Sequence, residues 1–411
     1  MSICLCQNIN IYIPVPDWGG WLSKTGEGEK ENHSTVAYMP PINSPITENK
    51  TVMHTIKLSE EVTASVKQEY TFITYDLAAA KKAYGILWAY TDRFHNVITR
   101  LGEFHMSCAY IGGMGKLVKG CGVEEVVLES GICASGSIEK VMNGKHYNRA
   151  RRVFRTVVEA LEHLCWENFL KVNNVNIGKE EMELLAKLSK DPTNDNIQNF
   201  VKHAKCVTLL AQYEEHKAKI RAGGCGKTPQ FWLWFMDKIW LLLRFLRATK
   251  CNNIPLLIAC MDEMIPIFFS ADRPNYAKYT PFYVQTLLNL PFTHPGAMEL
   301  LENNGMSVNR SDVPNSRNSC DITIEQTINR HASGSGSGII GFSRNFAAYH
   351  RWCLTRHARA EYLEATLEVA GIHSYAHCTH KDLNSADIKK SANAVAAVIA
   401  AFRGFTSPFE V

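Results

Sequence analysis

Residues 70–105 contain two strand-like segments separated by one helix-like segment, and this order restricts the fold more than any other feature of the chain. The first segment, "YTFITYD" (70–76), is rich in β-branched and aromatic residues, and "LAAAKKAYGILWAY" (77–90) follows it without a turn residue. The second strand candidate is "NVITRLGEFH" (96–105), and a glycine-rich stretch comes after it. Because strands joined through one helix usually pair in parallel, the sequence predicts a βαβ unit in a mostly parallel sheet.

The middle of the chain, residues 123–318, is predicted to be all-helical. Apolar residues recur there with helical spacing, and no strand candidate of comparable quality interrupts them. Its most apolar stretch, "FWLWFMDKIWLLLRFLRA" (231–248), resembles a membrane span at first sight. Four charged residues interrupt it, well short of the ~20 apolar residues that a span needs. We therefore predict a buried helix here and no transmembrane segment.

Composition and charge restrict the classes of function. The 411 residues are 46% hydrophobic and 20% charged, which is typical of a globular protein. A net charge of +4 is small, so any nucleic-acid surface has to be a local patch. The 13 cysteines show no regular CxxC pairing, and the first ten residues do not read as a signal peptide. Reduced thiols in the cytoplasm or nucleus are the natural interpretation.

Asp76 ends the first predicted strand, directly before the predicted helix. A helix N-cap explains an aspartate at this place fully. A catalytic role needs a second carboxylate, because one acid alone seldom holds a magnesium ion. Glu325 in "TIEQTINR" is a candidate, and Asp321 lies four residues earlier, on the same face if this segment is helical. Spacing alone does not bring Asp76 and Glu325 together.

A basic stretch, "GKHYNRARRVFR" (144–155), is a candidate nucleic-acid-binding surface. On a helix its arginines form a stripe that can neutralise phosphates, and the nearby aromatic residues could stack on bases. A solvated helix face explains the same charge pattern equally well. The basic residues of this stretch are Lys145, Arg149, Arg151, Arg152 and Arg155.

Two further motifs carry weaker signals. "RAGGCGKT" (221–228) is similar to a phosphate-binding loop, but Arg221 stands where the first glycine is required and the segment follows a helix instead of a strand. "HSYAHCTH" (373–380) places His373 and His377 on one helical face if the segment is a helix, as a zinc site would require. A polar loop between two helices explains this segment as well.

Four segments together resemble a known group of proteins. They are "FITYDLAAAKKAYGILW", "VITRLGEFHMSCAYIGGMGKLVKGCGVEEVVLESGICASGSIEKVMNGKHYNRARR", "DRPNYAKYTPFY" and "IEQTINRHASGSGSGIIGFSRN" with a following "HRW". The chain resembles, from about Pro16 to Gly371, a large group of uncharacterised, transposon-derived animal proteins. That group is similar in layout to the hAT and Kyakuja–Dileera–Zisupton DNA transposases, whose RNase H-like catalytic domains are split by a helical insertion.

The resemblance implies roles for individual residues. Asp76 matches the second acid of such a catalytic core, and Glu325 matches its closing glutamate. The stretch 102–105 takes the place of the histidine-bearing strand, where His105 would support the metal ligands or contact a phosphate. In such cores the acids, here Asp76 and Glu325, hold two Mg²⁺ ions across the scissile phosphate.

The resemblance also implies what this chain lacks and how it is organised. Such cores need a first acid on the opening strand, and the only acid near an early strand here is Asp17, which aligns better with a later loop. We therefore expect an amino-terminally truncated copy that does not cut DNA, and Mg²⁺ only where the site is complete. The expected fold is an α/β RNase H-like remnant with a large all-α insertion, mainly helical overall. Its expected parts are a partial α/β core (1–122), the helical insertion (123–318), the closing glutamate motif with a Gly/Ser loop (319–345) and C-terminal helices (346–411).

Two functional hypotheses follow. The first is a degenerate transposase whose ancestral activity was metal-dependent DNA cleavage and strand transfer. The alternative is a non-catalytic helical module that binds nucleic acid or another protein. DNA and a second copy of the chain are candidate partners, a membrane is not, and the nucleus or the cytoplasm is the expected location.

Overall fold

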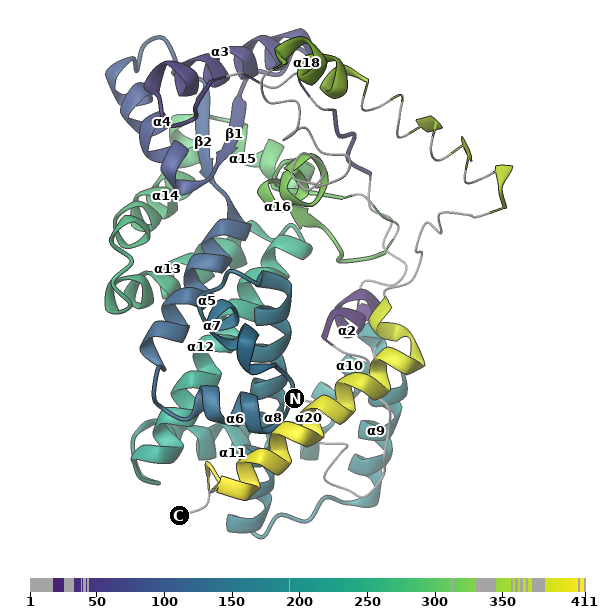
Figure 1. Ribbon diagram of the computed structural model, residues 1–411. Coiled ribbons are helices and arrows are strands. Elements are labelled where there is room, and N and C mark those ends of the chain that lie inside the picture. The colour runs from purple at the N-terminus through teal and green to yellow at the C-terminus, as the bar shows by residue number, and fades with distance from the viewer. Residues whose placement is uncertain are drawn as a thin grey trace.

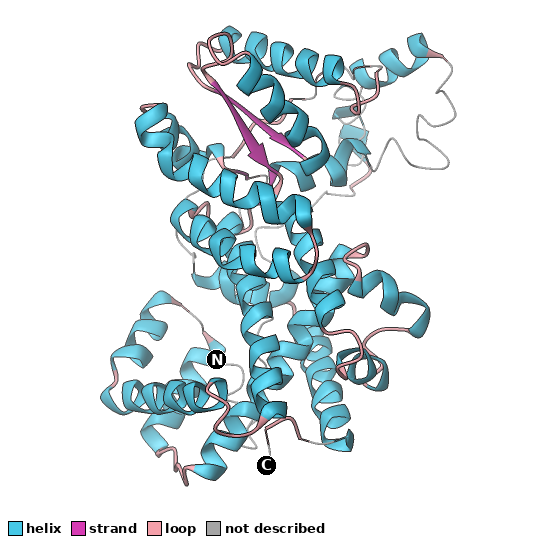
Figure 2. Ribbon diagram, turned by 90° about the vertical axis from the view of Figure 1, so that its left-hand side faces the viewer, coloured by secondary structure: helices cyan, strands magenta, loops and turns pink. Residues whose placement is uncertain are grey.

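The computed structural model is mainly helical, with two small sheets (Figures 1 and 2). The residues that it describes are 18–25, 33–37, 39, 42, 44–191, 193–309, 311, 313–329, 345–355, 358, 361–362, 365–366, 369–371, 381–405 and 407–409.

The predicted βαβ unit is confirmed. Strands β1 (Thr71–Tyr75) and β2 (Val97–Leu101) pair in parallel, with Thr71 opposite Val97 and Tyr75 opposite Leu101. Helix α4 (Leu77–Ala89) connects them, and helices surround the pair in the upper part of the molecule (Figure 2). All five residues of β2 are buried, as expected for a strand that is covered on both faces.

The second strand is shorter than predicted, and this changes the environment of His105. Strand β2 ends at Leu101, and helix α5 (Glu103–Leu117) begins after a single intervening residue, Gly102. His105 therefore lies in the first turn of a helix and not on a strand, contrary to the sequence-based expectation. The helix forms because Met106, Tyr110 and Met114 recur at helical spacing and are all buried.

The sheet content of the described residues is small. Besides β1 and β2, the described ranges hold one short antiparallel pair, β3 (Ser307–Val308) with β4 (Asn318–Ser319). The mainly helical character is thus confirmed, whereas the RNase H-like core stays a prediction. The predicted all-helical segment keeps this character up to Gly305, and β3 begins two residues later, within the range predicted to be helical.

Helices make up the middle of the chain, in agreement with the sequence. The predicted buried helix at 231–248 is part of α12, and most of its apolar side chains are buried. No helix within the described ranges combines the length and apolar character that a bilayer crossing requires. The helices of this part are α6 (Val123–Glu129), α7 (Ser135–Met142), α8 (Tyr147–Val172), α9 (Lys179–Lys190), α10 (Asn194–Lys202), α11 (Ala204–Arg221), α12 (Lys227–Lys250), α13 (Ile254–Ser270), α14 (Pro274–Thr293) and α15 (Ala297–Leu300).

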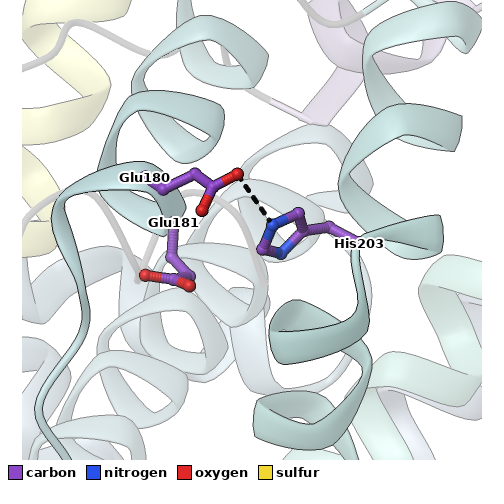
Figure 3. Close-up of side chains that lie close together, drawn as sticks. All are labelled: Glu180, Glu181 and His203. Atoms are coloured by element: carbon purple, nitrogen blue, oxygen red, sulfur yellow. Dashed lines mark ion pairs between the residues drawn. The ribbon is translucent and has the colours of Figure 1, made fainter.

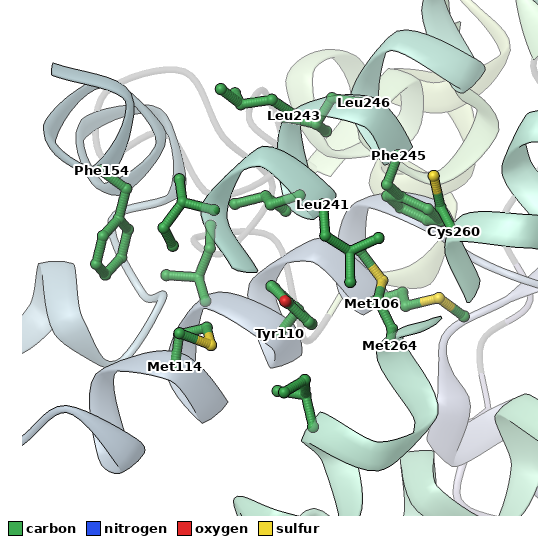
Figure 4. Packing of buried hydrophobic residues seen from close by; sticks show 14 of the residues in the cluster. Met106, Tyr110, Met114, Phe154, Leu241, Leu243, Phe245, Leu246, Cys260 and Met264 are labelled. Carbon is green, nitrogen blue, oxygen red and sulfur yellow. The ribbon is translucent and has the colours of Figure 1, made fainter. Parts of the chain in front are cut away.

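The core connects the strand pair with this helical block. Figure 4 shows side chains of α5, α8, α12 and α13 meeting, including Tyr110, Phe154, Phe245 and Met264, which are all fully buried. Helix α5 starts at the end of β2 and contacts α7, α8, α12 and α13. A single helix therefore carries the N-terminal turn with His105 and also anchors it in the largest apolar cluster.

The remaining elements complete both ends of the chain. The Gly/Ser loop (331–341), the histidine-rich segment (373–380) and Asp17 lie outside the described residues. Helix α20 packs along α8 and α6 (Figure 1). These elements are α2 (Trp18–Thr25), α3 (Asn49–Ser65), η1 (Leu301–Gly305), α16 (Cys320–Ile324), η2 (Glu325–Asn329), α18 (Phe346–Leu354), η4 (Lys381–Leu383) and α20 (Ser385–Phe405).

Candidate functional site

The candidate site lies at the edge of the sheet where β1 and β2 both end. Because the strands are parallel, their carboxyl ends meet there, and the Gly102 amide donates to the Tyr75 carbonyl at 2.9 Å. Asp76 follows β1, and its Oδ1 accepts a hydrogen bond of 2.9 Å from the Ala79 amide as the N-cap of α4. The expected N-cap role is therefore present. The Asp76 side chain is nevertheless exposed at this edge.

A second acid, Asp321, reaches the same edge from a distant part of the sequence. Its Oδ1 accepts from the Phe104 amide at 3.2 Å, and its Oδ2 accepts from the His105 amide at 3.0 Å. The Nδ1 atom of His105 also lies 3.0 Å from Oδ2, across 216 positions of the chain. Asp321 thus caps α5 from outside the helix, because the N-cap residue Gly102 has no side chain with which to do so.

Gly102 makes this approach possible. A Cβ atom at residue 102 would overlap the carboxylate of Asp321. The backbone of Gly102 has φ −67° and ψ 121°, which any residue can adopt. The glycine is therefore required for space and not for backbone conformation.

The carboxylate and the imidazole stabilise each other's charged forms. Burial opposes the charge of Asp321, but hydrogen bonds from the His105 side chain, the His105 amide and Ser319 together lower the pKa of Asp321. The hydrogen bond to Asp321 raises the pKa of His105 against a smaller effect of burial. The Asp321 side chain is 7% exposed and that of His105 is 35% exposed, so solvent reaches the imidazole and hardly the carboxylate.

Glu325 stands one turn after Asp321, where α16 passes into the π-helical turn η2. Its carboxylate is half-buried, and its Oε1 accepts a hydrogen bond of 3.0 Å from Asn329. The charges of Asp76 and Glu325 both raise the pKa of His105, after the larger effects of Asp321 and burial. The charges of Asp76, Asp321 and Glu325 therefore all favour the charged form of His105.

These acids do not form a closed cluster of ligands. Among the described residues, the group of three His, Cys, Asp or Glu side chains whose ligand atoms all lie within 4.8 Å of one another is Glu180, Glu181 and His203, at another place in the molecule. One oxygen of Asp76 and one of Glu325 each accept a local hydrogen bond, from the Ala79 amide and the Asn329 side chain respectively. The site is therefore an open acidic edge around His105.

A buried ion pair connects the end of β2 to the start of α5, next to this edge of the sheet. Arg100 of β2 and Glu103 of α5 lie 2.7 Å apart, and their side chains are 1% and 2% exposed. Arg100 also donates to the carbonyl of Met306 at 2.7 Å and to that of Gly305 at 3.1 Å. Burial raises the pKa of Glu103 although the charge of Arg100 acts in the opposite direction. Arg100 thus fixes the segment before β3 to the strand that leads to His105.

The comparisons with known proteins identify a family. The model of a domain of unknown function, DUF8702, matches residues 17–411. The chain belongs to the DUF8702 family. A comparison with curated proteins and another with solved structures found no match.

The predicted basic stretch of this DUF8702 chain is only partly available to a ligand. Lys145, Arg149 and Arg152 are exposed around the start of α8, and Arg149 donates to Ser137 Oγ at 2.7 Å. Arg155 does not belong with them, because its side chain is 11% exposed and its Nε lies 3.6 Å from Glu159 Oε1. Arg151 is half-buried, with its guanidinium 5.8 Å from the centre of the Tyr147 ring.

The cluster of Glu180, Glu181 and His203 is explained by ion pairs (Figure 3). His203 Nε2 lies 3.3 Å from Glu180 Oε1, and Lys205 Nζ lies 3.2 Å from Glu181 Oε1. Adjacent residues of a helix point in different directions, which is unfavourable for two ligands of one ion. We therefore do not assign a metal to this cluster of the DUF8702 chain.

Asp321 is the site residue that sequence reasoning left without a role. Its position four residues before Glu325 was the available signal, since both side chains then lie on one face of a helix. Nothing in the sequence indicated its partner, because His105 is more than two hundred positions away. The Arg100–Glu103 pair was detectable only as a charged pair at helical spacing across the end of a strand.

Proposed function

We propose that this chain derives from a DNA transposase and keeps, around His105, the part of the active site that held Mg²⁺ and the phosphate backbone. The observation that carries this proposal is the meeting of acids from two ends of the chain at the carboxyl edge of parallel strands. Asp76 follows β1, and Asp321 and Glu325 arrive after the long helical segment. Ligand and catalytic sites of sheets with parallel strands typically lie at this edge.

The donor atoms suit magnesium. Mg²⁺ prefers oxygen ligands, keeps several waters and is usually bound through one or two carboxylates, so a closed cluster of three ligands is not required. Asp76 and Glu325 would hold the ion, since one oxygen of each makes the local hydrogen bond and the other is not used in it. A bound Mg²⁺ would supply charge stabilisation at a phosphate oxygen and a more acidic water.

His105 and Asp321 would act on the phosphate without being metal ligands. Asp321 holds the Nδ1 side of the imidazole and raises the pKa of His105, which favours the cation. The ring is 35% exposed, and its Nε2–H would then be available to donate to a phosphate oxygen. Asp321 is used in capping α5 and in holding His105, so Asp76 and Glu325 remain as the two acids of the ancestral set. We infer that this site binds a phosphate and no longer cleaves DNA.

The test is magnesium binding followed at His105. We expect Mg²⁺ to lower the pKa of His105, read from its imidazole proton resonances by NMR, because the ion offsets the field of the two carboxylates. Asp76→Asn and Glu325→Gln should each abolish most of this response, and Asp272→Asn, an exposed acid on another loop, should not. A pKa of His105 that is unchanged by Mg²⁺ in the wild-type protein would refute the metal site.

A plasmid-nicking assay tests the loss of cleavage separately. We expect no nicking with Mg²⁺ or Mn²⁺. Nicking that disappears in Asp76→Asn would show that activity survives, whereas nicking that is the same in both proteins would come from a contaminating nuclease.

A protein of this origin would act on chromosomal DNA, so we propose that it acts in the nucleus and expect self-association on DNA.

The alternative proposal is a non-catalytic nucleic-acid-binding module, and the exposed basic residues at the start of α8 favour it. Replacing Arg149 and Arg152 by Met should weaken binding to all sequences alike and lower the log–log salt slope by about two units. The control is Arg244→Met, which removes an exposed arginine whose charge is already paired with Glu263. An unchanged slope in the double variant would leave these arginines as ordinary helix surface.

A further inference from the structure

A groove lies where α3 and α14 pack against α4, in the upper part of Figure 1. It offers about 610 Å³ of open space, which is within the ~300–1,000 Å³ that is usual for ligand sites. Part of its wall is apolar, because Met53 of α3, Ile86 of α4 and Tyr279 of α14 line it. None of the described residues that line the groove belongs to the acidic edge around His105. The groove is therefore a separate place on the molecule.

Three lysines line this groove. Lys50 comes from α3, and Lys81 and Lys82 come from the second turn of α4. Lys81 donates to the amide oxygen of Asn275 at 3.0 Å, and Lys82 donates to that of Asn49 at 3.3 Å. An amide oxygen positions an ammonium group without neutralising it, so both charges remain available to an anion.

The charge of the groove is positive. Lys50 pairs with Glu48 at 2.8 Å, and both of these side chains are exposed, so the pair is easily exchanged for another partner. Among the described residues that line the groove there is no aspartate or glutamate. Lysines that gather on two neighbouring helices raise the local potential and favour an anionic ligand.

Gly85 lines the same groove from the inner part of α4. A glycine inside a helix lowers stability relative to alanine. The helical backbone of α4 does not require it, and a Cβ atom at this position would meet no neighbouring group of the described chain within 4 Å. A solvated helix face would account for the lysines but not for this glycine. A ligand that occupies the space above α4 accounts for both.

Tyr90 lines the groove where α4 ends, and it is 54% exposed. Its ring lies edge-on to that of the buried Phe94, with 6.5 Å between the ring centres. A positively charged groove with an accessible aromatic ring is the combination that binds single-stranded nucleic acids, whose bases stack on the ring. The bases of a duplex are already stacked on one another, so this ring favours a single strand.

We propose that this groove binds a segment of single-stranded nucleic acid, with its phosphates at Lys50, Lys81 and Lys82 and a base stacked on Tyr90. Ammonium groups bind phosphate oxygens as point charges, and the apolar wall accepts the sugar and the base. The inference adds a second contact with the class of partner that the proposed function names. It rests on the groove and not on the Mg²⁺ site at the acidic edge.

Fluorescence anisotropy of a labelled oligothymidylate of about ten nucleotides, a length that such grooves cover, tests the assignment with the full chain and without divalent metal. We expect saturable binding to the wild-type protein and at least tenfold weaker binding to Gly85→Leu, because the new side chain enters the groove. Leucine is a better helix former than glycine, so this variant should be at least as stable as wild type in urea. Its loss of binding then cannot be ascribed to unfolding. The matched control is Gly404→Leu in α20, where a Cβ also meets open space, and it should bind as the wild-type protein does.

Two further variants separate the base contact from the phosphate contacts. Tyr90→Ala should weaken binding by about fivefold to a hundredfold, the range for one lost stacked base, whereas Tyr90→Phe keeps the ring and should bind as wild type. Replacing Lys81 and Lys82 by Met should lower the log–log salt slope by about 1.4, since each phosphate contact with a single strand contributes ~0.7. Lys219→Met, which removes an exposed lysine from α11, should leave the slope unchanged.

Any of three results would overturn the assignment. They are the absence of saturable binding to the wild-type protein, unchanged binding to Gly85→Leu, and equal weakening by Tyr90→Ala of a single strand and of a duplex of the same length. The titration contains no divalent metal, and the arginines of α8 are intact in every variant. Its result is therefore independent of the Mg²⁺ response of His105 and of the test of the α8 surface.

Discussion

Replacing Asp321 by Ala should destabilise the protein far more than a change at any other acid of the site. The substitution removes the acceptor of three hydrogen bonds, from the Phe104 amide, the His105 amide and the His105 ring. It also leaves the N-terminus of α5 without a cap where the backbone is buried. Hydrogen bonds to a charged group contribute about 1.5–3 kcal/mol each and a lost cap costs about 1 kcal/mol, with overlap between the terms. We expect the free energy of unfolding to fall by about 3–5 kcal/mol.

Urea unfolding measured by circular dichroism gives this number, and Glu325→Gln is the control. Glu325 stands one turn later on the same element, is half-buried, and bonds the exposed Asn329. Its substitution should change the free energy of unfolding by less than about 0.5 kcal/mol, as surface changes usually do. If Asp321→Ala and Glu325→Gln had equal effects, Asp321 would not hold the first turn of α5.

The difference in free energy of unfolding between the wild-type protein and Asp321→Ala should depend on pH in a defined direction. The lowered pKa of Asp321 gives stability that is present above its unfolded value of about 3.8 and is lost as the pH falls through the folded value. The raised pKa of His105 gives stability that is complete below about 6.5 and is lost as the pH rises through the folded value. The gap between wild type and Asp321→Ala should therefore be widest between about pH 4 and 6.5 and narrower at pH 8. A gap that widened steadily above pH 6.5 would contradict the ion pair.

Three further substitutions have clear expectations. Gly102→Ala should lower the free energy of unfolding by about 1–3 kcal/mol, because the new Cβ clashes with Asp321. Gly85→Ala in α4, where a Cβ meets open space, should leave the free energy of unfolding unchanged or raise it. Thermal unfolding of the two variants measures both effects. Arg100→Met should lower the free energy of unfolding by about 3–5 kcal/mol because it leaves Glu103 buried and unpaired. Arg244→Met breaks the exposed pair with Glu263 and should lower it by at most about 1 kcal/mol, both measured by urea unfolding. Asp76→Ala should lower the free energy of unfolding by about 1 kcal/mol, because it removes the N-cap of α4. Asp76→Asn should restore most of this loss in urea unfolding if Asp76 stabilises the fold through capping alone.

Local sequence patterns predicted the elements whose signal is itself local. The strand at 71–75 and the helix after it follow from β-branched residues, an alanine-rich run and Asp76 as cap, and their parallel pairing with β2 follows from element order. The boundary at Gly102 was missed for a physical reason. A glycine after an apolar strand gives no helix-start signal by itself, and the group that caps α5 comes from residue 321. The start of a helix that is capped from a remote segment cannot be recognised from its own sequence.

The role of a charged residue is also difficult to predict from its own segment of the sequence. Arg155 belongs to a basic stretch in the sequence, yet its neighbour one turn later, Glu159, holds it inside the helical bundle. Arg151, four residues earlier, instead faces a cavity whose other cations come from α12 and from the segment before β4. Charge spacing along one helix predicts which side chains share a face. What that face meets is decided by elements that the spacing does not include.

The long helical segment is what brings Asp321 and Glu325 back to the strands. Helix α5 leads away from the sheet edge into the core, and α12, α13 and α14 pack in succession on the way back. Helix α14 then lies against α4, with the Tyr84 and Phe282 rings 5.0 Å apart, and Tyr70 at the start of β1 donates to the Pro295 carbonyl at 3.0 Å. From there the chain needs only the Arg100 contacts to set the 305–306 turn and deliver Asp321 to α5. The position of the closing acids thus depends on a packed helical block and not on a loop. Changes in the α14–α4 contact should therefore alter the pKa of His105, as its imidazole proton resonances would show.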